Sequence, residues 1–180
     1  MIYTSPAPNN FIPTTLPSFV GASPPAYTSG GQGLVSTADD YLNFARMLLA
    51  HGIADGTRVL KPETVKLMTS NHITVVQRQF PSLVTDWKTQ GFGLGISIIE
   101  DAKTYAAGGR GAGSAGSFGW GGAFGGWWQA DPAEDMILIW LQEVLPPPPT
   151  APPAPGVMPR IPGALATIAF QRAAYATRHK

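Results

Sequence analysis

The chain has no cysteine among its 180 residues. This absence excludes disulfide bridges, cysteine-ligated zinc, iron–sulfur clusters and a thiol nucleophile. Charged residues are also scarce, at 13% of the chain, against a usual share of about 25%. Lys and Arg number 12 and acidic residues 11, so the net charge is +1. Because no strong electrostatic field is available, we expect neither nucleic acid nor an anionic membrane as a partner.

Long apolar runs are missing as well. The longest uninterrupted run, at 136–141, is far too short to span a bilayer. Residues 1–6 carry neither a positive charge nor an apolar block, so we expect no signal peptide there. The sequence therefore leaves the compartment open.

Glycine (21 residues) and proline (18 residues) are abundant instead, which predicts many turns. The length suits about one domain, and its composition changes along the chain. Residues 1–33, rich in Pro, Ser, Thr and Gly, predict an extended or looping segment that lies on another part of the fold. Residues 34–145 form the main body, 146–162 a proline-rich loop, and 163–180 a last amphipathic helix.

Two helices are predicted near the start of the main body. Hydroxyl and carboxyl side chains at 36–40 suit a helix N-terminus, because they accept hydrogen bonds from its free N–H groups. Apolar residues then recur at helical spacing until Gly52 ends the pattern; they are Tyr41, Phe44, Ala45, Leu48 and Leu49. Pro62 suits the first turn of a second helix that runs to about Ser70.

Three stretches are predicted as strands. Between Phe92 and Ile98, large apolar residues alternate with glycine and serine, which predicts one strand with a nearly bare face. Residues 117–127 (SFGWGGAFGGW) predict a second strand with many small residues. The apolar run at 136–142 predicts a strand buried on both faces, and the turn at 131–135 joins it to the preceding strand as an antiparallel hairpin.

Most familiar catalytic patterns do not occur. Adjacent carboxylates at 39–40, 100–101 and 134–135 lie at helix starts or turns, where capping explains them. The three histidines lack metal-binding spacing, so we expect no metal site and no cofactor. G-x-G-x-x-G occurs at 111–116, but no predicted helix follows it. Neither G-x-S-x-G nor Ser-x-x-Lys occurs, so the sequence has no recognisable nucleophile.

The stretch rich in glycine and tryptophan is the most specific candidate site. A strand bordered by glycines can expose backbone N–H and C=O groups to an extended ligand, and one such N–H can stabilise an oxyanion. A tight strand crossing packed by the tryptophans explains the same residues equally well. The residues alone leave both interpretations open.

A series of motifs then points to a family. They are GGQGLVSTADDY (30–41), FARMLL (44–49), DGTRVL (55–60), GFGLG (91–95), FGWGGA (118–123) and DP (131–132). In this order and spacing, residues 28–142 resemble the beta-lactamase-related serine hydrolases. That family includes class C beta-lactamases, family VIII esterases and penicillin-binding-protein-like peptidases.

The resemblance implies an α+β fold of three layers, with an antiparallel sheet flanked by helices, of which 34–145 would be the C-terminal portion. It also implies acyl transfer through a serine ester on a small-molecule ester or amide, such as a beta-lactam, a peptide or a small ester. Trp120, Gly121 and Gly122 match the family's Lys-Thr-Gly-like triplet in its Trp-Gly-Gly form, which implies that they bind substrate. The backbone N–H of Ala123, just after the triplet, is implied as half of the oxyanion hole.

The chain departs from the family in one respect. The Ser-x-x-Lys helix and the Tyr-x-Asn loop precede the matched region in the family, and neither appears here. We therefore interpret the chain as an incomplete hydrolase, inactive alone, with a missing N-terminal half as partner. A fragment, a split gene product and a degenerate copy all fit. The alternative is a non-catalytic ligand-binding or structural module that uses the strand rich in glycine and tryptophan.

Overall fold

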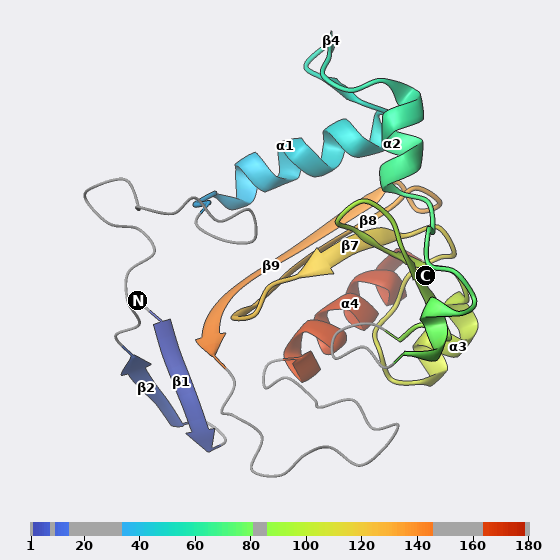
Figure 1. The fold of residues 1–180 in the computed structure, drawn as a ribbon. Helices are drawn as coiled ribbons and strands as arrows, with labels where there is room; N and C mark the ends of the chain where they lie inside the picture. Colours follow the sequence, from blue (N-terminus) through green and yellow to red (C-terminus); the bar gives the residue numbers. More distant parts are fainter. Residues whose placement is uncertain (1, 8–9, 15–33, 81–85, 146–163, 179–180) are drawn as a thin grey trace, which may run out of the picture.

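The structure is a computed structural model that describes residues 2–7, 10–14, 34–80, 86–145 and 164–178. Its centre is a seven-stranded sheet in the order β2-β1-β9-β8-β7-β6-β5 (Figure 1). Neighbouring strands are antiparallel, except that β1 and β9 are parallel. The strands are β1 (Ile2–Ala7), β2 (Asn10–Thr14), β5 (Gln90–Phe92), β6 (Ser97–Ile99), β7 (Phe118–Gly121), β8 (Gly125–Asp131) and β9 (Met136–Leu145). A separate small hairpin consists of β3 (Ile53–Ala54) and β4 (Thr57–Arg58).

Helices cover both faces of this sheet. α1 (Ala38–Leu49) and α2 (Pro62–Met68) lie on one side, and α4 (Ala164–Arg178) lies on the other, with α3 (Ala102–Ala107) beside it (Figure 1). A 3-10 turn, η1, spans Gln77–Gln79. The predicted architecture, an antiparallel sheet flanked by helices, is confirmed. No helix within the described ranges has the length and apolar character needed to cross a membrane.

Local sequence explains both ends of α1. Thr37 caps its start: the hydroxyl oxygen accepts the N–H of Asp40 at 3.1 Å, and the hydroxyl donates to the Asp40 carboxylate at 2.9 Å. The helix ends at Leu49, and Gly52 follows with φ at 93°. A Cβ at Gly52 would lie 2.1 Å from the carbonyl oxygen of Leu60, so only glycine fits.

The core lies between α1, α2 and the middle of the sheet. Trp128 of β8 is at its centre, with ring centroids 5.6 Å from Tyr41, 5.7 Å from Phe44 and 6.1 Å from Phe118. The predicted helical stripe faces the sheet, with Ala45 and Leu48 buried, although Phe44 stays 37% exposed. The buried core residues are Ala45, Met47, Leu48, Val65, Ile96, Ile98, Phe118, Trp128 and Ala130.

A buried polar network attaches α4 to the opposite face. Asp131 is 1% exposed, and its carboxylate accepts the O–H of Tyr175 at 2.5 Å and the N–H of Ser114 at 2.9 Å. The side-chain amide of Gln129 donates to the Tyr175 hydroxyl at 2.8 Å. Burial alone would raise the pKa of Asp131, but the hydrogen bonds from Tyr175 and Ser114 hold that pKa below its ordinary value. The charged carboxylate of Asp131 on β8 therefore holds α4 and the glycine-rich loop at 111–116, which contains Ser114.

The prediction of one strand between Phe92 and Ile98 is wrong, because the chain turns there. β5 ends at Phe92 and β6 begins at Ser97, and the two strands pair antiparallel with Gly95 at φ 81° between them. Gly93 nevertheless lies close to another backbone, as the predicted bare face implied, because a Cβ there would lie 1.9 Å from the carbonyl oxygen of Met68. The end of α2 crosses the chain at this point.

The prediction of one strand over 117–127 is also wrong. β7 ends at Gly121 and β8 begins at Gly125, and the two strands form a hairpin with Trp120 opposite Trp128. The hairpin predicted across 131–135 is confirmed as β8 and β9. β9 is not buried on both faces along its whole length, because Leu141 is 66% exposed.

The remaining segments add three short elements that the sequence did not predict: β1, β2 and α3. Within residues 1–33, the described residues form β1 and β2, and β1 pairs with the end of β9. α3 was not expected, although the Asp101 side chain caps it by accepting the N–H of Thr104 at 3.0 Å. α2 ends at Met68, earlier than predicted, and α4 forms the last helix. The proline-rich loop predicted at 146–162 lies outside the described residues, and the division into four segments stays a prediction.

We expect Leu48→Ala to lower the free energy of unfolding by about 2–5 kcal/mol, because it leaves a cavity in the packed core. Denaturant unfolding followed by circular dichroism measures this loss. Leu67→Ala makes the same change on α2 at a side chain that is 52% exposed, and it should cost less than about 0.5 kcal/mol. Equal, small losses for both variants would contradict the placement of α1.

Asp131→Asn should lower the free energy of unfolding at neutral pH by roughly 1.5–3 kcal/mol, because a charged acceptor of two buried hydrogen bonds is lost. The folded-state pKa of Asp131 lies below its unfolded-state value of about 3.9. Its stabilisation is therefore complete above that value and disappears as the pH falls through the folded-state pKa. Urea unfolding of both proteins across the acidic range should show the difference shrinking; parallel pH profiles would refute this account.

Candidate functional site

The candidate site lies at the turn between β7 and β8. The N–H of Gly125 donates to the carbonyl oxygen of Gly122 at 3.0 Å, and the N–H of Gly122 donates to that of Gly126 at 2.6 Å. These bonds close a tight turn just after Gly121. Ala123 lies at its tip and is exposed.

The backbone N–H of Ala123 is available to a ligand. Within the described part of the chain, it donates to no acceptor. An N–H in this state can stabilise the negative charge that develops on a carbonyl oxygen during acyl transfer, provided that the oxygen comes within hydrogen-bond distance. Among the described residues, the turn therefore presents one backbone N–H without an acceptor.

The glycines around this donor differ in what they do. A Cβ at Gly119 would lie 2.1 Å from the carbonyl oxygen of Trp128, so the close crossing of β7 and β8 requires glycine there. A Cβ at Gly121 or Gly122 would meet nothing closer than 3.7 Å or 3.6 Å, respectively. Packing does not require glycine at these two positions, and they leave open space beside Ala123.

Trp120 connects the turn to a row of aromatic rings. Its ring centroid lies 5.0 Å from that of Phe92, and Phe92 lies 6.4 Å from Trp87, both in edge-to-face geometry. All three side chains are partly exposed. Trp120 pairs with Trp128, so the row begins on the sheet face that carries α1. The rings form an apolar wall that extends from the turn.

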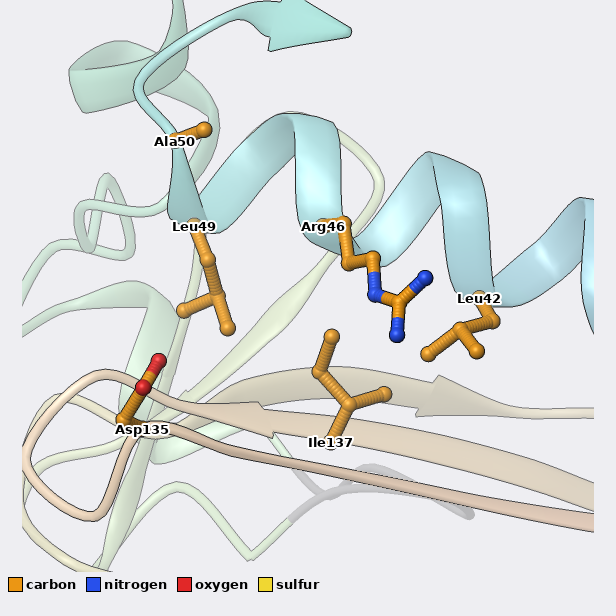
Figure 2. Close-up of a pocket in the computed structure, with 6 residues that line it drawn as sticks. All are labelled: Leu42, Arg46, Leu49, Ala50, Asp135 and Ile137. Atoms are coloured by element: carbon orange, nitrogen blue, oxygen red, sulfur yellow. The ribbon is translucent and has the colours of Figure 1, made fainter. Parts of the chain in front are cut away.

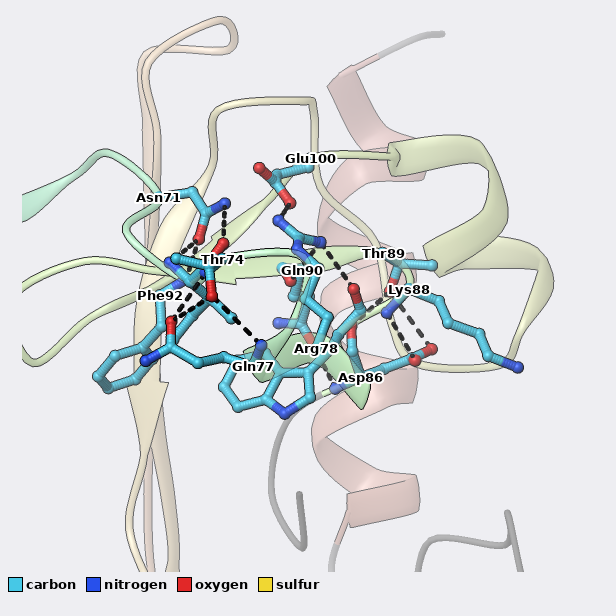
Figure 3. A network of polar contacts seen from close by, with 12 residues as sticks. Asn71, Thr74, Gln77, Arg78, Asp86, Lys88, Thr89, Gln90, Phe92 and Glu100 are labelled. Atoms are coloured by element: carbon cyan, nitrogen blue, oxygen red, sulfur yellow. Dashed lines mark hydrogen bonds and ion pairs between the residues drawn. The ribbon is translucent and has the colours of Figure 1, made fainter. Parts of the chain in front are cut away.

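A polar network fixes the backbone that carries this row (Figure 3). The side-chain oxygen of Asn71 accepts the N–H of Phe92 at 3.1 Å. The guanidinium of Arg78 donates to the carbonyl oxygen of Trp87 at 2.7 Å and forms an ion pair with Glu100. The loop with Trp87 and the strand with Phe92 are thus tied to neighbouring elements.

The described residues do not supply a nucleophile at this turn. Ser117, next to the start of β7, is 0% exposed, so a substrate cannot reach its hydroxyl. No three His, Asp or Glu side chains in the described ranges gather as a metal site. Among the described residues, the candidate site thus consists of an exposed backbone turn and a row of aromatic rings.

A separate cleft of about 590 Å³ opens between α1 and the start of β9 (Figure 2). Its lining residues are Leu42, Arg46, Leu49, Ala50, Asp135 and Ile137. None of them belongs to the β7–β8 turn or to the aromatic row. The cleft is thus distinct from the candidate site.

Comparison with known proteins identifies the family. The beta-lactamase family profile matches residues 3–158. The chain belongs to the beta-lactamase family. Two proteins of Mycobacterium tuberculosis, Protein Rv1367c of strain H37Rv and the uncharacterized protein MT1414 of strain CDC 1551, are each 48% identical to it over 121 residues. That region is 66% of this chain and 30% of each relative.

Solved structures of this beta-lactamase-like fold also match. EstCE1, a hydrolase with promiscuous acyltransferase activity, is 30% identical with a TM-score of 0.54, and the match covers 81% of this chain and 34% of EstCE1. Unliganded simvastatin synthase (LovD) from Aspergillus terreus is 22% identical with a TM-score of 0.59, over 84% of this chain and 37% of LovD, and shares the fold. This beta-lactamase-family chain thus spans about a third of the length of these proteins.

The residues that the sequence singled out lie close to one another. Trp120, Gly121, Gly122 and Ala123 lie together in one hairpin, as their adjacency requires. Trp87 and Phe92 carry no sequence signal that connects them with this hairpin. The motif GFGLG contains Phe92, but the alignment of β5 beside β6 and β7 that brings Phe92 to Trp120 comes from the fold.

Proposed function

We propose that this chain is the C-terminal portion of a serine hydrolase that cleaves an ester or amide through an acyl-serine intermediate. The observation that carries the proposal is the N–H of Ala123, which has no acceptor among the described residues, beside two glycines that packing does not require. In this role, Trp120, Gly121 and Gly122 line the substrate site, and Ala123 supplies half of the oxyanion hole.

In this reaction, the turn that carries Ala123 stabilises the charge on the substrate oxygen. A serine from the missing N-terminal part attacks the substrate carbonyl, and the carbonyl electron pair moves onto oxygen, where the Ala123 N–H stabilises it. Collapse of this intermediate expels the alcohol or amine and leaves the acyl-serine, which water then hydrolyses. Membership of the beta-lactamase family and the likeness to EstCE1, a hydrolase, support this assignment.

The length of the relatives supports the placement of the nucleophile in another part of the protein. The matched region is 30% of Protein Rv1367c and 34% of EstCE1, so a complete protein has room for the nucleophile elsewhere. A non-catalytic module that uses the same hairpin is the alternative function. It predicts ligand binding without turnover, even when a complementary part is present.

We expect the chain alone to hydrolyse neither p-nitrophenyl acetate nor nitrocefin above background, because its sequence has no Ser-x-x-Lys motif. Addition of the separately expressed part of EstCE1 that precedes the matched region should produce turnover of p-nitrophenyl acetate, with each part alone as control. Two results would count against the proposal. One is turnover by this chain alone that a serine-directed phosphonate blocks; the other is a complex that forms but remains inactive.

The Gly122→Val variant distinguishes two interpretations of this hairpin, a wall of the substrate site and a strand that only packs. The nearest atom to a Cβ at Gly122 is 3.6 Å away, so the variant should keep its melting temperature within about 2 °C. In the reconstituted enzyme, its side chain should fill the space beside the oxyanion donor and lower turnover by about 100-fold. Gly119→Val, the matched control, should unfold the chain. Full turnover by Gly122→Val would remove Gly122 from the substrate site.

A further inference from the structure

Two partly exposed rings continue the row that starts at Trp120. Phe92 lies on β5, and Trp87 lies in the loop before that strand. The ring centroids of Trp120 and Phe92 are 5.0 Å apart, and those of Phe92 and Trp87 are 6.4 Å apart. None of the three rings belongs to the buried core, although tryptophan is highly buried on average. Packing in the core therefore does not explain why these rings lie together.

Two arginines hold the backbone around Trp87. The guanidinium of Arg78 donates to the carbonyl oxygen of Trp87 at 2.7 Å and pairs with Glu100. Figure 3 shows Arg78 between Glu100 and the loop that begins at Asp86. Arg110 forms an ion pair with Asp86, the residue before Trp87, at 3.8 Å. A ring on a backbone that is already fixed loses less conformational freedom when it binds a ligand.

The charges beside the row compensate one another. Arg78 is paired with Glu100, and Arg110 with Asp86, so these four groups add no net charge near the rings. An uncharged ligand group is therefore favoured. Aromatic rings attract one another in edge-to-face or offset geometry at centroid distances of about 4.5–7 Å. A flat group of two fused rings is long enough to contact neighbouring rings of the row together.

The row starts beside the turn that carries Ala123. Trp120 and Ala123 belong to the same hairpin, with only Gly121 and Gly122 between them. A Cβ at either glycine would meet nothing closer than 3.6 Å. A ligand that accepts a hydrogen bond from the Ala123 N–H can thus extend over the two glycines toward Trp120 without displacing a side chain.

We propose that Trp87, Phe92 and Trp120 bind an aromatic group of the substrate, so that the complete enzyme prefers esters or amides that carry such a group. We call these three residues the aryl-binding row. The inference rests on the proposed function, in which Trp120 lines the substrate site. It adds Trp87 and Phe92 as residues that determine specificity, and it narrows the substrate to an aryl ester or amide.

The test titrates this chain alone with 2-naphthyl acetate and with decahydro-2-naphthyl acetate, which has the same carbon skeleton without aromatic rings. NMR of the isotope-labelled chain follows the indole N–H signals. The signals of Trp87 and Trp120 should shift, whereas that of Trp128, which is 5% exposed, should not. The naphthyl ester should bind about fivefold more tightly than the saturated ester, because only the naphthyl group forms aromatic pairs with the row.

Side-chain variants locate the binding. Trp87→Leu and Phe92→Leu should each weaken binding of the naphthyl ester by about fivefold and change that of the saturated ester less than about twofold. Trp87→Phe keeps a ring and should lose less than Trp87→Leu. Phe80→Leu is the matched control, because it removes a ring that is 66% exposed and outside the row, and it should bind like the wild type. Circular dichroism establishes that each variant is folded.

Three results would overturn the proposal. They are unchanged Trp87 and Trp120 signals, equal affinity of the wild-type chain for the two esters, and folded leucine variants that both bind the naphthyl ester like the wild type. The titration measures binding by this chain and needs no serine nucleophile. Selective binding of the naphthyl ester, together with an inactive reconstituted enzyme, therefore counts against the proposed function and leaves the aryl-binding row in place.

Discussion

Burial of Trp128 is the interaction on which the rest of the structure depends. This side chain, 5% exposed, brings α1 onto the sheet through Tyr41 and Phe44, and it contacts Phe118 on the neighbouring strand. A single large ring thus determines which face of α1 is buried and how β7 aligns with β8. That alignment, with Trp120 opposite Trp128, places the turn at Gly122–Gly125 and Ala123 at its tip. The position of the Ala123 N–H follows from the packing of the core.

Sequence patterns located the elements whose signals are local. The cap at Thr37 and the apolar stripe predicted α1, and the turn at 131–135 predicted the hairpin of β8 and β9. The alternation from Phe92 to Ile98 failed, because the same alternation fits a strand or a hairpin whose turn is at Gly95. The apolar run of β9 misled for a related reason: it reports the character of the side chains and does not show whether both faces are covered along the whole strand, and Leu141 is exposed. The row from Trp87 to Trp120 depends on the order of the strands, which no local pattern encodes.

The two faces of the sheet are held by different physical means. Aromatic and aliphatic side chains pack α1 onto one face, whereas a charged carboxylate at Asp131 holds α4 on the other. Burial raises the pKa of Tyr175, and the adjacent carboxylate raises it further, so Tyr175 remains a hydrogen-bond donor. Directional bonds of this kind fix the helix in one position more strictly than apolar contacts do. The glycine-rich loop, through Ser114, is fixed with it.

The strand order also bears on how the chain folds. β5, β6, β7, β8 and β9 lie across the sheet in the order in which they follow each other along the chain. The pairings of β5 with β6, β7 with β8 and β8 with β9 each close a short loop, whereas residues 100–117, with α3, join β6 to β7. Pairings across short loops form early and fast. By contrast, Tyr175 reaches Asp131 across 44 residues, and β1 reaches β9 across almost the whole described chain. The wall that carries Trp120 and Ala123 can thus assemble during synthesis from neighbouring hairpins, before the distant contacts close around it.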